Sequence, residues 1–125
     1  MHLSNEPVTI YHNPACSKSR ETLAIIREHG IEPHIVEYLK TPPDADTIRA
    51  IIERLKIRPE ELIRHAEHEF KEHFAGKRLD DEAWIQALAK HPKLMQRPIV
   101  IRGKHAALGR PPENVLQLLN EPKNR

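Results

Sequence analysis

A lone cysteine, Cys16, is the residue in this sequence best suited to do chemistry. It follows a short apolar segment and a loop, and it precedes a stretch with helical spacing, so the pattern places it at a helix N-terminus. Unpaired backbone N–H groups and the positive end of the helix dipole favour thiolate over thiol there, and His12, Lys18 and Arg20 are nearby sources of positive charge. We therefore predict a nucleophilic thiolate at neutral pH, in preference to the alternative of a buried, inert cysteine.

The same loop is suited to binding an oxyanion. Consecutive N–H groups from Ala15 to Ser19 can form a cradle, with the hydroxyls of Ser17 and Ser19 beside it. The spacing differs from the C-x5-R loop of tyrosine phosphatases, and Ser19 stands where a C-x-x-C motif would have its second cysteine. Without a second thiol in the chain, a sulfur-bound intermediate has to be resolved by another molecule, such as glutathione or a dithiol protein.

Two predicted strands and one helix position this loop. The pattern from Pro7 to Tyr11 predicts a first strand, and the Asn and Pro residues after it predict a turn. Apolar residues at helical spacing follow Cys16, with Gly30 as a left-handed C-cap. His34 to Leu39 predicts a second strand, which a right-handed crossover makes parallel to the first. The N-terminal part of the chain is therefore predicted to be a β-α-β unit.

Helices are predicted for the middle of the chain, and a hairpin and a last helix for its end. The middle helices begin at capping or proline residues: one at Asp44, one from Pro59 to about Gly76, and one at Asp80 or Asp81 that stops before Pro92. Arg97 to Arg102 and His105 to Leu108 predict strands joined by a tight Gly103-Lys104 turn, and Pro111 or Pro112 begins the final helix. This order resembles an α/β, thioredoxin-like mixed sheet with a helical insertion at about 44–91, in one domain over residues 1–125.

Composition narrows the class of protein. At 125 residues the chain fits one domain, and 20 Lys and Arg against 18 Asp and Glu leave a net charge of only +2, without the basic excess of a nucleic-acid-binding module. One cysteine excludes an internal disulfide and suits a reducing cytosol, and no apolar run approaches the roughly 20 residues that cross a bilayer. We therefore expect a cytoplasmic protein that binds neither nucleic acid nor membrane.

A metal site and a nucleotide site are both disfavoured. Histidine and glutamate side chains recur at helical spacing at His65, His68, Glu69, Glu72 and His73. The final histidine of H-E-x-x-H is missing, and a solvated, charged helix face explains these residues better than a metal site does. No Gly-rich phosphate loop or dinucleotide fingerprint occurs. We expect no bound metal and no bound cofactor.

Short segments spread along the chain together resemble one family. They are, in order, Ile10-Tyr11-His12-Asn13-Pro14-Ala15-Cys16, Ser19-Arg20, Tyr38-Leu39 followed by Thr41-Pro42-Pro43, Leu62-Ile63-Arg64, His91-Pro92, Arg97-Pro98-Ile99-Val100 and Gly109-Arg110-Pro111. Over roughly residues 7–119 the chain resembles the arsenate reductases of the glutaredoxin-coupled ArsC type.

The resemblance implies an enzyme that reduces arsenate to arsenite. Cys16 would attack the arsenic of bound arsenate, His12 would help to keep Cys16 ionised, and Pro98 would be a cis-proline facing the active cysteine. Guanidinium forks match tetrahedral oxyanions, and three arginines would hold this one: Arg64, Arg97 and Arg110. Glutathione is the implied co-substrate and glutaredoxin the implied partner.

Two alternatives to an arsenate reductase stay open. Spx-type proteins, which bind RNA polymerase and regulate transcription, are similar over the same length, but they typically carry C-x-x-C and lack the three arginines. The second alternative is another glutathione-dependent thiol oxidoreductase.

Overall fold

The computed structural model describes residues 6–119, which fall into two compact units. The first comprises residues 6–37 and 97–119, and the second is Tyr38–Gln96. The insertion predicted at about 44–91 lies within the second unit, and its membership of one domain with the sheet stays a prediction. Within the described range, every helix is too short or too polar to cross a bilayer.

The first unit is built on a mixed four-stranded sheet. Its strands are β1 (Val8–His12), β2 (His34–Glu37), β3 (Ile99–Arg102) and β4 (His105–Leu108), in the spatial order β2-β1-β3-β4. β1 pairs in parallel with β2 and antiparallel with β3, and β3 pairs antiparallel with β4. The predicted strands, the hairpin and the parallel β-α-β unit are confirmed.

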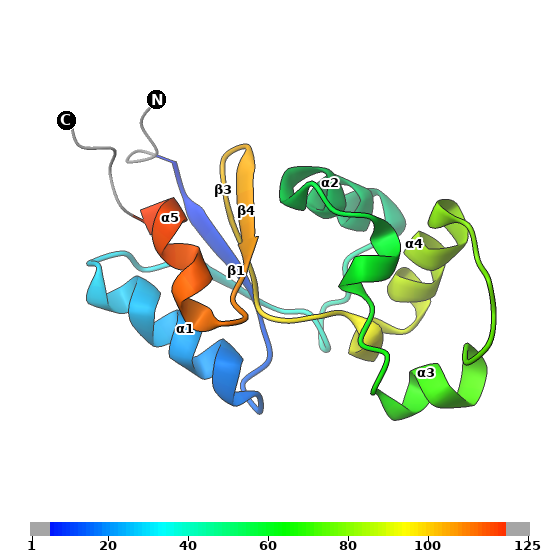
Figure 1. Ribbon diagram of the computed structural model, residues 1–125. Coiled ribbons are helices and arrows are strands. Elements are labelled where there is room, and N and C mark those ends of the chain that lie inside the picture. Colours follow the sequence, from blue (N-terminus) through cyan, green and yellow to red (C-terminus); the bar gives the residue numbers. More distant parts are fainter. Residues whose placement is uncertain (1–5, 120–125) are drawn as a thin grey trace. The chain divides into compact units, whose positions relative to one another are not determined.

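Helices α1 (Ser17–Glu28) and α5 (Leu116–Leu119) lie on the same face of this sheet, with the short helix η3 (Pro112–Val115) leading into α5 (Figure 1). The core that they cover is aliphatic: Val8, Ile10, Ile26, Val100, Ala107, Val115, Leu118 and Leu119. Gly30 takes a left-handed φ of 77° just after α1, and its N–H donates to the Arg27 carbonyl at 2.9 Å, which is the predicted C-cap. Because this core holds α1 against β1, the loop between them is fixed at both ends.

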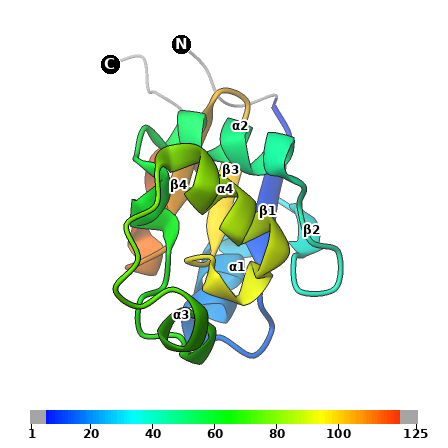
Figure 2. The ribbon, with the colours of Figure 1, turned by 90° about the vertical axis from the view of Figure 1, so that its right-hand side faces the viewer.

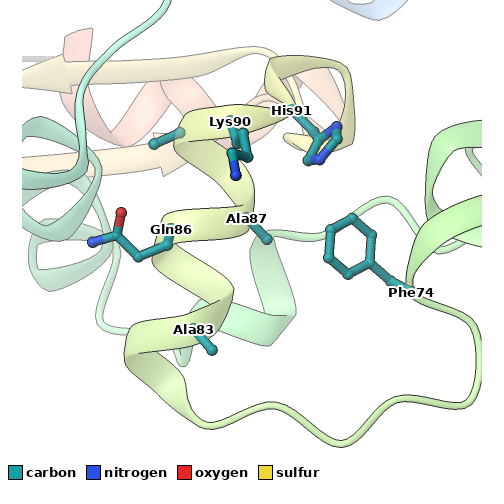
Figure 3. Close-up of a pocket in the computed structure, with 7 residues that line it drawn as sticks. Phe74, Ala83, Gln86, Ala87, Lys90 and His91 are labelled. Atoms are coloured by element: carbon teal, nitrogen blue, oxygen red, sulfur yellow. The ribbon is translucent and has the colours of Figure 1, made fainter.

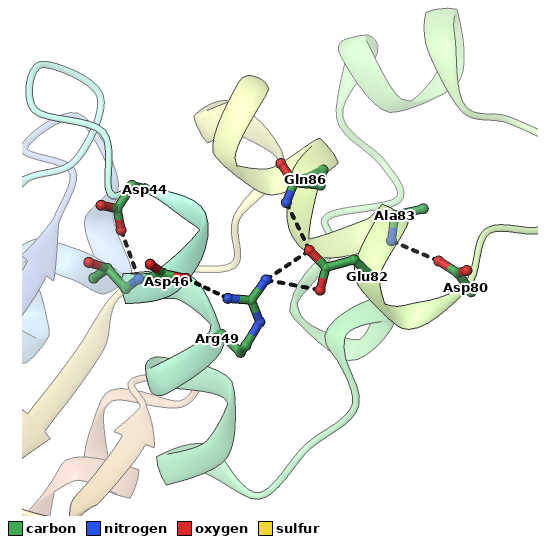
Figure 4. Close-up of polar contacts among 8 residues, drawn as sticks. Asp44, Asp46, Arg49, Asp80, Glu82, Ala83 and Gln86 are labelled. Atoms are coloured by element: carbon green, nitrogen blue, oxygen red, sulfur yellow. Dashed lines mark hydrogen bonds and ion pairs between the residues drawn. The ribbon is translucent and has the colours of Figure 1, made fainter.

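The second unit is helical. Its elements are α2 (Ala45–Leu55), η1 (Pro59–Leu62), α3 (His68–His73), α4 (Asp81–Lys90) and η2 (Pro92–Leu94). α4 packs against α2 and η1 (Figure 2). Asp44 and Asp80 cap α2 and α4 as predicted, each accepting a backbone N–H at 2.8 Å. Arg49 of α2 also reaches Glu82 of α4 at 2.7 Å, so charge pairing supplements the apolar contact (Figure 4).

The prediction of one helix from Pro59 to about Gly76 is wrong. The chain there forms a single 3₁₀ turn, then an extended residue, and only later α3. Ile63 has φ −88° and ψ 133° and forms an isolated antiparallel bridge with Met95. The flanking bonds are Arg64 N–H to the Leu94 carbonyl at 2.7 Å and Gln96 N–H to the Leu62 carbonyl at 2.8 Å. Pairing with a segment distant in sequence therefore overrides the local helical spacing.

Candidate active site

The loop that carries the cysteine is shaped by Asn13. Its carbonyl accepts the Cys16 N–H at 3.0 Å, which closes a turn, and its side-chain oxygen accepts the Ala15 N–H at 3.0 Å. Arg20 braces the same turn by donating to the Pro14 carbonyl at 2.9 Å. The turn predicted from the Asn and Pro residues before the cysteine is confirmed, and the structure adds that both oxygens of Asn13 accept its hydrogen bonds.

Cys16 is the N-cap residue of α1, and 9% of its surface is exposed. Burial raises the pKa of the Cys16 thiol, but the Ser19 N–H, the Arg97 guanidinium and the Lys18 N–H lower it by more, so the pKa lies below its ordinary value. The helix N-terminus acts on sulfur as the sequence predicts. The positive side chain among these causes is Arg97, whereas Lys18 contributes its backbone N–H.

Arg97 is the cation that the fold brings to the sulfur. It comes just before β3, and the bond between Arg97 and Pro98 is cis, as the resemblance implies. Two guanidinium nitrogens, Nε and Nη1, are buried, and no group in residues 6–119 accepts a hydrogen bond from either. Buried donors are normally paired, so this guanidinium can offer two donors to an anion that contacts the thiolate.

Arg110 belongs to the same unit as Arg97 and is tied to it. Its Nη1 donates to the Arg97 carbonyl at 3.0 Å, and its side chain is otherwise exposed. Two of the three predicted arginines are therefore joined directly, since the Arg110 side chain bonds to the backbone of Arg97.

His12 and Ser19 form a buried pair beside the cysteine loop. His12 Nδ1 lies 2.6 Å from Ser19 Oγ, which also accepts the Asn13 N–H at 3.0 Å. Burial lowers the pKa of His12; Glu37 opposes this effect, and Arg27 and Arg20 add to it. At neutral pH the ring is therefore mostly uncharged. It does not supply the positive charge that the sequence suggested for it, and its contact with the cysteine helix is through Ser19.

Arg64, the third predicted arginine, lies in the second unit. Its Nη1 donates to Glu67 Oε2 at 3.1 Å and to the Lys93 carbonyl at 3.3 Å, and about a quarter of its side chain is exposed. Its backbone is held by the bridge next to Ile63. A role for Arg64 at the thiol stays a prediction.

The second unit has a pocket of its own, about 530 Å³ in volume. Phe74, Ala83, Gln86, Ala87, Ala89, Lys90 and His91 line it, and Ala87 lies opposite the Phe74 ring (Figure 3). The lining offers neither a thiol nor a guanidinium. Within residues 6–119, no three His, Cys, Asp or Glu side chains come together in a way that could hold a metal ion.

Fold and site together define a thioredoxin-like α/β protein in which one activated thiol faces a guanidinium. Comparison with known proteins makes the assignment specific: the model of the ArsC family matches residues 11–118. The chain belongs to the ArsC family.

Relatives and solved structures agree with this assignment. The chain is 50% identical to the Escherichia coli K12 protein named uncharacterized protein YfgD, over 90% of this chain and 96% of that one. It is 40% identical to an arsenate reductase of Neisseria meningitidis, over 90% of this chain and 97% of that one. The structure of an arsenate reductase from Vibrio cholerae superposes with a TM-score of 0.87 at 43% identity, over 91% of this chain and 98% of that one. The predicted fold class is confirmed.

Proposed function

We propose that this protein is an arsenate reductase in which Cys16 is the nucleophile. The observation that carries the proposal is a thiol with a lowered pKa beside Arg97, whose Nε and Nη1 are buried donors without an acceptor in residues 6–119. A tetrahedral oxyanion supplies the missing acceptors and puts its central atom next to a nucleophile. Membership of the ArsC family selects arsenate among such anions.

The first step is a substitution at arsenic. The Cys16 thiolate forms an S–As bond, and one As–O bond breaks as that oxygen takes up a proton and leaves as water. Arg97 and Arg110 hold the remaining oxygens and stabilise the charge that develops on the leaving oxygen. We assign Arg64 to the same anion.

The second step moves two electrons to arsenic. The thiolate of glutathione attacks Sγ of Cys16, an S–S bond forms, and the electron pair of the S–As bond stays on arsenic, which leaves as arsenite. Cys16 is then joined to glutathione. Because the chain holds no second cysteine, an external thiol must break this disulfide, and glutaredoxin is the partner we propose. No metal or bound cofactor enters either step.

His12 and Ser19 act together as positioning residues in this mechanism. The Ser19 N–H lowers the pKa of the Cys16 thiol, while its side chain is held by the His12 ring and the Asn13 N–H. His12 thus helps to keep Cys16 ionised by fixing the helix turn that contacts sulfur. Because the Ser19 N–H acts on sulfur and the Ser19 hydroxyl is engaged by His12 and Asn13, we assign Ser19 to the thiolate and leave the anion to the arginines.

A coupled assay tests the proposal. NADPH oxidation is followed with arsenate, glutathione, glutaredoxin and glutathione reductase, and we expect turnover that Cys16→Ser abolishes. Arg97→Gln should lower kcat/KM for arsenate roughly a hundredfold, whereas Arg78→Gln, a matched change at an exposed arginine, should not. Arsenate turnover that survives Cys16→Ser would exclude the mechanism.

The same assay identifies the electron donor. Exchanging glutathione, glutaredoxin and glutathione reductase for thioredoxin and thioredoxin reductase should stop turnover if the glutathione route is correct. Equal rates with both systems would contradict the proposed coupling while leaving the first step intact. These donors operate in the cytoplasm, where we propose that the protein acts.

A further inference from the structure

Gly109 immediately precedes Arg110, and neighbouring atoms leave no room for a side chain at this position. A Cβ on Gly109 would lie 2.5 Å from Thr22 Oγ1 and 2.7 Å from Pro98 Cγ. Gly30 and Gly76, by contrast, have left-handed φ values and nothing within 4 Å of a Cβ. The positive φ that explains those two glycines is absent at Gly109.

The atoms that crowd Gly109 are firmly held. Thr22 is fully buried in α1, and its Oγ1 donates to the Lys18 carbonyl at 2.8 Å. Pro98 is a buried, rigid ring at the entry to β3. Neither group is the end of a flexible side chain, so a side chain at position 109 has to move its own segment away.

That segment is tied to the anion site by two hydrogen bonds. The Gly109 N–H donates to the Pro98 carbonyl at 2.9 Å, and Arg110 Nη1 donates to the Arg97 carbonyl at 3.0 Å. The close approach at Gly109 therefore sets how near the Arg110 guanidinium lies to the backbone that carries Arg97. Restoring an ordinary contact of about 3.5 Å to Thr22 Oγ1 requires a shift of roughly 1 Å.

We propose that Gly109 is a positioning residue: the absence of a side chain lets the end of β4 pack against α1 and Pro98, and this places Arg110 in the anion site. The inference deepens the proposed function, because the anion concerned is the arsenate assigned above. A displacement of about 1 Å in a group that orients a substrate can lower kcat/KM up to a hundredfold.

The test is Gly109→Ala, read first without arsenate. Cys16 is alkylated with iodoacetate and with neutral iodoacetamide, and the ratio of the two rates reports the positive charge that an anion meets as it approaches sulfur. We expect Gly109→Ala to lower this ratio toward the value of Arg110→Gln, while iodoacetamide alone reacts at nearly the wild-type rate. In the coupled assay the KM for arsenate should rise roughly tenfold or more.

Gly30→Ala is the matched control. It introduces a methyl group at a left-handed φ in open space, so it should lower Tm without changing the alkylation ratio or the KM. Gly109→Ala/Thr22→Ala removes the shorter of the two contacts, so it should recover part of the ratio lost in Gly109→Ala, with Thr22→Ala alone as reference.

Two results would overturn the proposal. One is a folded Gly109→Ala protein with the wild-type alkylation ratio and KM. The other is a Gly109→Ala protein that does not fold and that Thr22→Ala does not restore, which would assign the glycine to the core. Wild-type protein without arsenate turnover would instead refute the proposed function, and the alkylation ratio would still test Gly109.

Discussion

Replacing Ser19 with alanine should cost far more stability than its single oxygen atom suggests. Ser19 is fully buried, and its hydroxyl bonds both to the His12 ring at 2.6 Å and to the Asn13 N–H at 3.0 Å. In Ser19→Ala the His12 ring loses a buried hydrogen bond and the Asn13 N–H a partly buried one, and each such loss costs about 1–3 kcal/mol. We expect the free energy of unfolding to fall by about 3 kcal/mol and Tm by roughly 10 °C.

Urea denaturation of paired variants measures this effect. Ser17→Ala is the matched control, because Ser17 lies two residues earlier in α1 with an exposed side chain, and its change should stay within about 0.5 kcal/mol. A double-mutant cycle with His12→Ala should give a coupling energy above about 0.5 kcal/mol, since the two side chains share one bond. Equal midpoints for Ser19→Ala and Ser17→Ala, or additive effects in the cycle, would refute this reasoning.

Three further predictions concern charge. Arg97→Gln should raise the pKa of the Cys16 thiol and slow its alkylation by iodoacetamide at pH 7 roughly tenfold, because Arg97 is the positive side chain that lowers this pKa. Arg110→Gln should leave that rate within about twofold, because the Arg110 side chain bonds to the Arg97 carbonyl and is otherwise exposed; equal slowing in both would contradict the assignment. Because burial holds the pKa of His12 below 6.5 in the folded state, its contribution to stability is complete above pH 6.5 and is lost as pH falls toward the folded pKa, so wild type should lose more unfolding free energy than His12→Asn between pH 7 and pH 5; identical losses would refute this. Arg49→Gln removes the carboxylate contacts drawn in Figure 4, and it should lower Tm more in low salt than in 1 M salt, where pairs of exposed charges are screened; a decrease independent of salt would point to lost packing.

The sequence was most informative where structure is local. Asp44 and Asp80 each accept a backbone N–H three residues ahead, and such caps are readable from residue type and spacing. Gly30 ends α1 with the left-handed conformation that only glycine adopts easily. The position of Cys16 at the start of a helix follows from the same kind of pattern, so a thiol beside helix N–H groups could be predicted.

Contacts between distant segments were beyond such reasoning. Spacing in sequence gives no sign that Ile63 bridges Met95, so one helix from Pro59 to about Gly76 was predicted across a residue that is extended. From sequence, the positive charge beside the thiol was assigned to residues near Cys16 in the chain. The fold provides it from Arg97, which follows the insertion in the sequence. The space at Gly109 likewise depends on how β4 meets α1, which no local rule contains.

That the positive charge beside the thiol comes from Arg97 and not from His12 has a chemical consequence. A histidine cation next to sulfur would be lost as pH rises through its pKa near 6.5, and the thiolate would lose its partner in the physiological range. A guanidinium keeps its charge at every pH at which the protein is folded. Because burial keeps His12 mostly neutral at neutral pH and Arg97 supplies the charge, the thiolate and its anion site should keep the same electrostatic environment from about pH 7 to pH 9. Over that interval, the affinity for the anion should therefore change only where the anion or the Cys16 thiol gains or loses a proton.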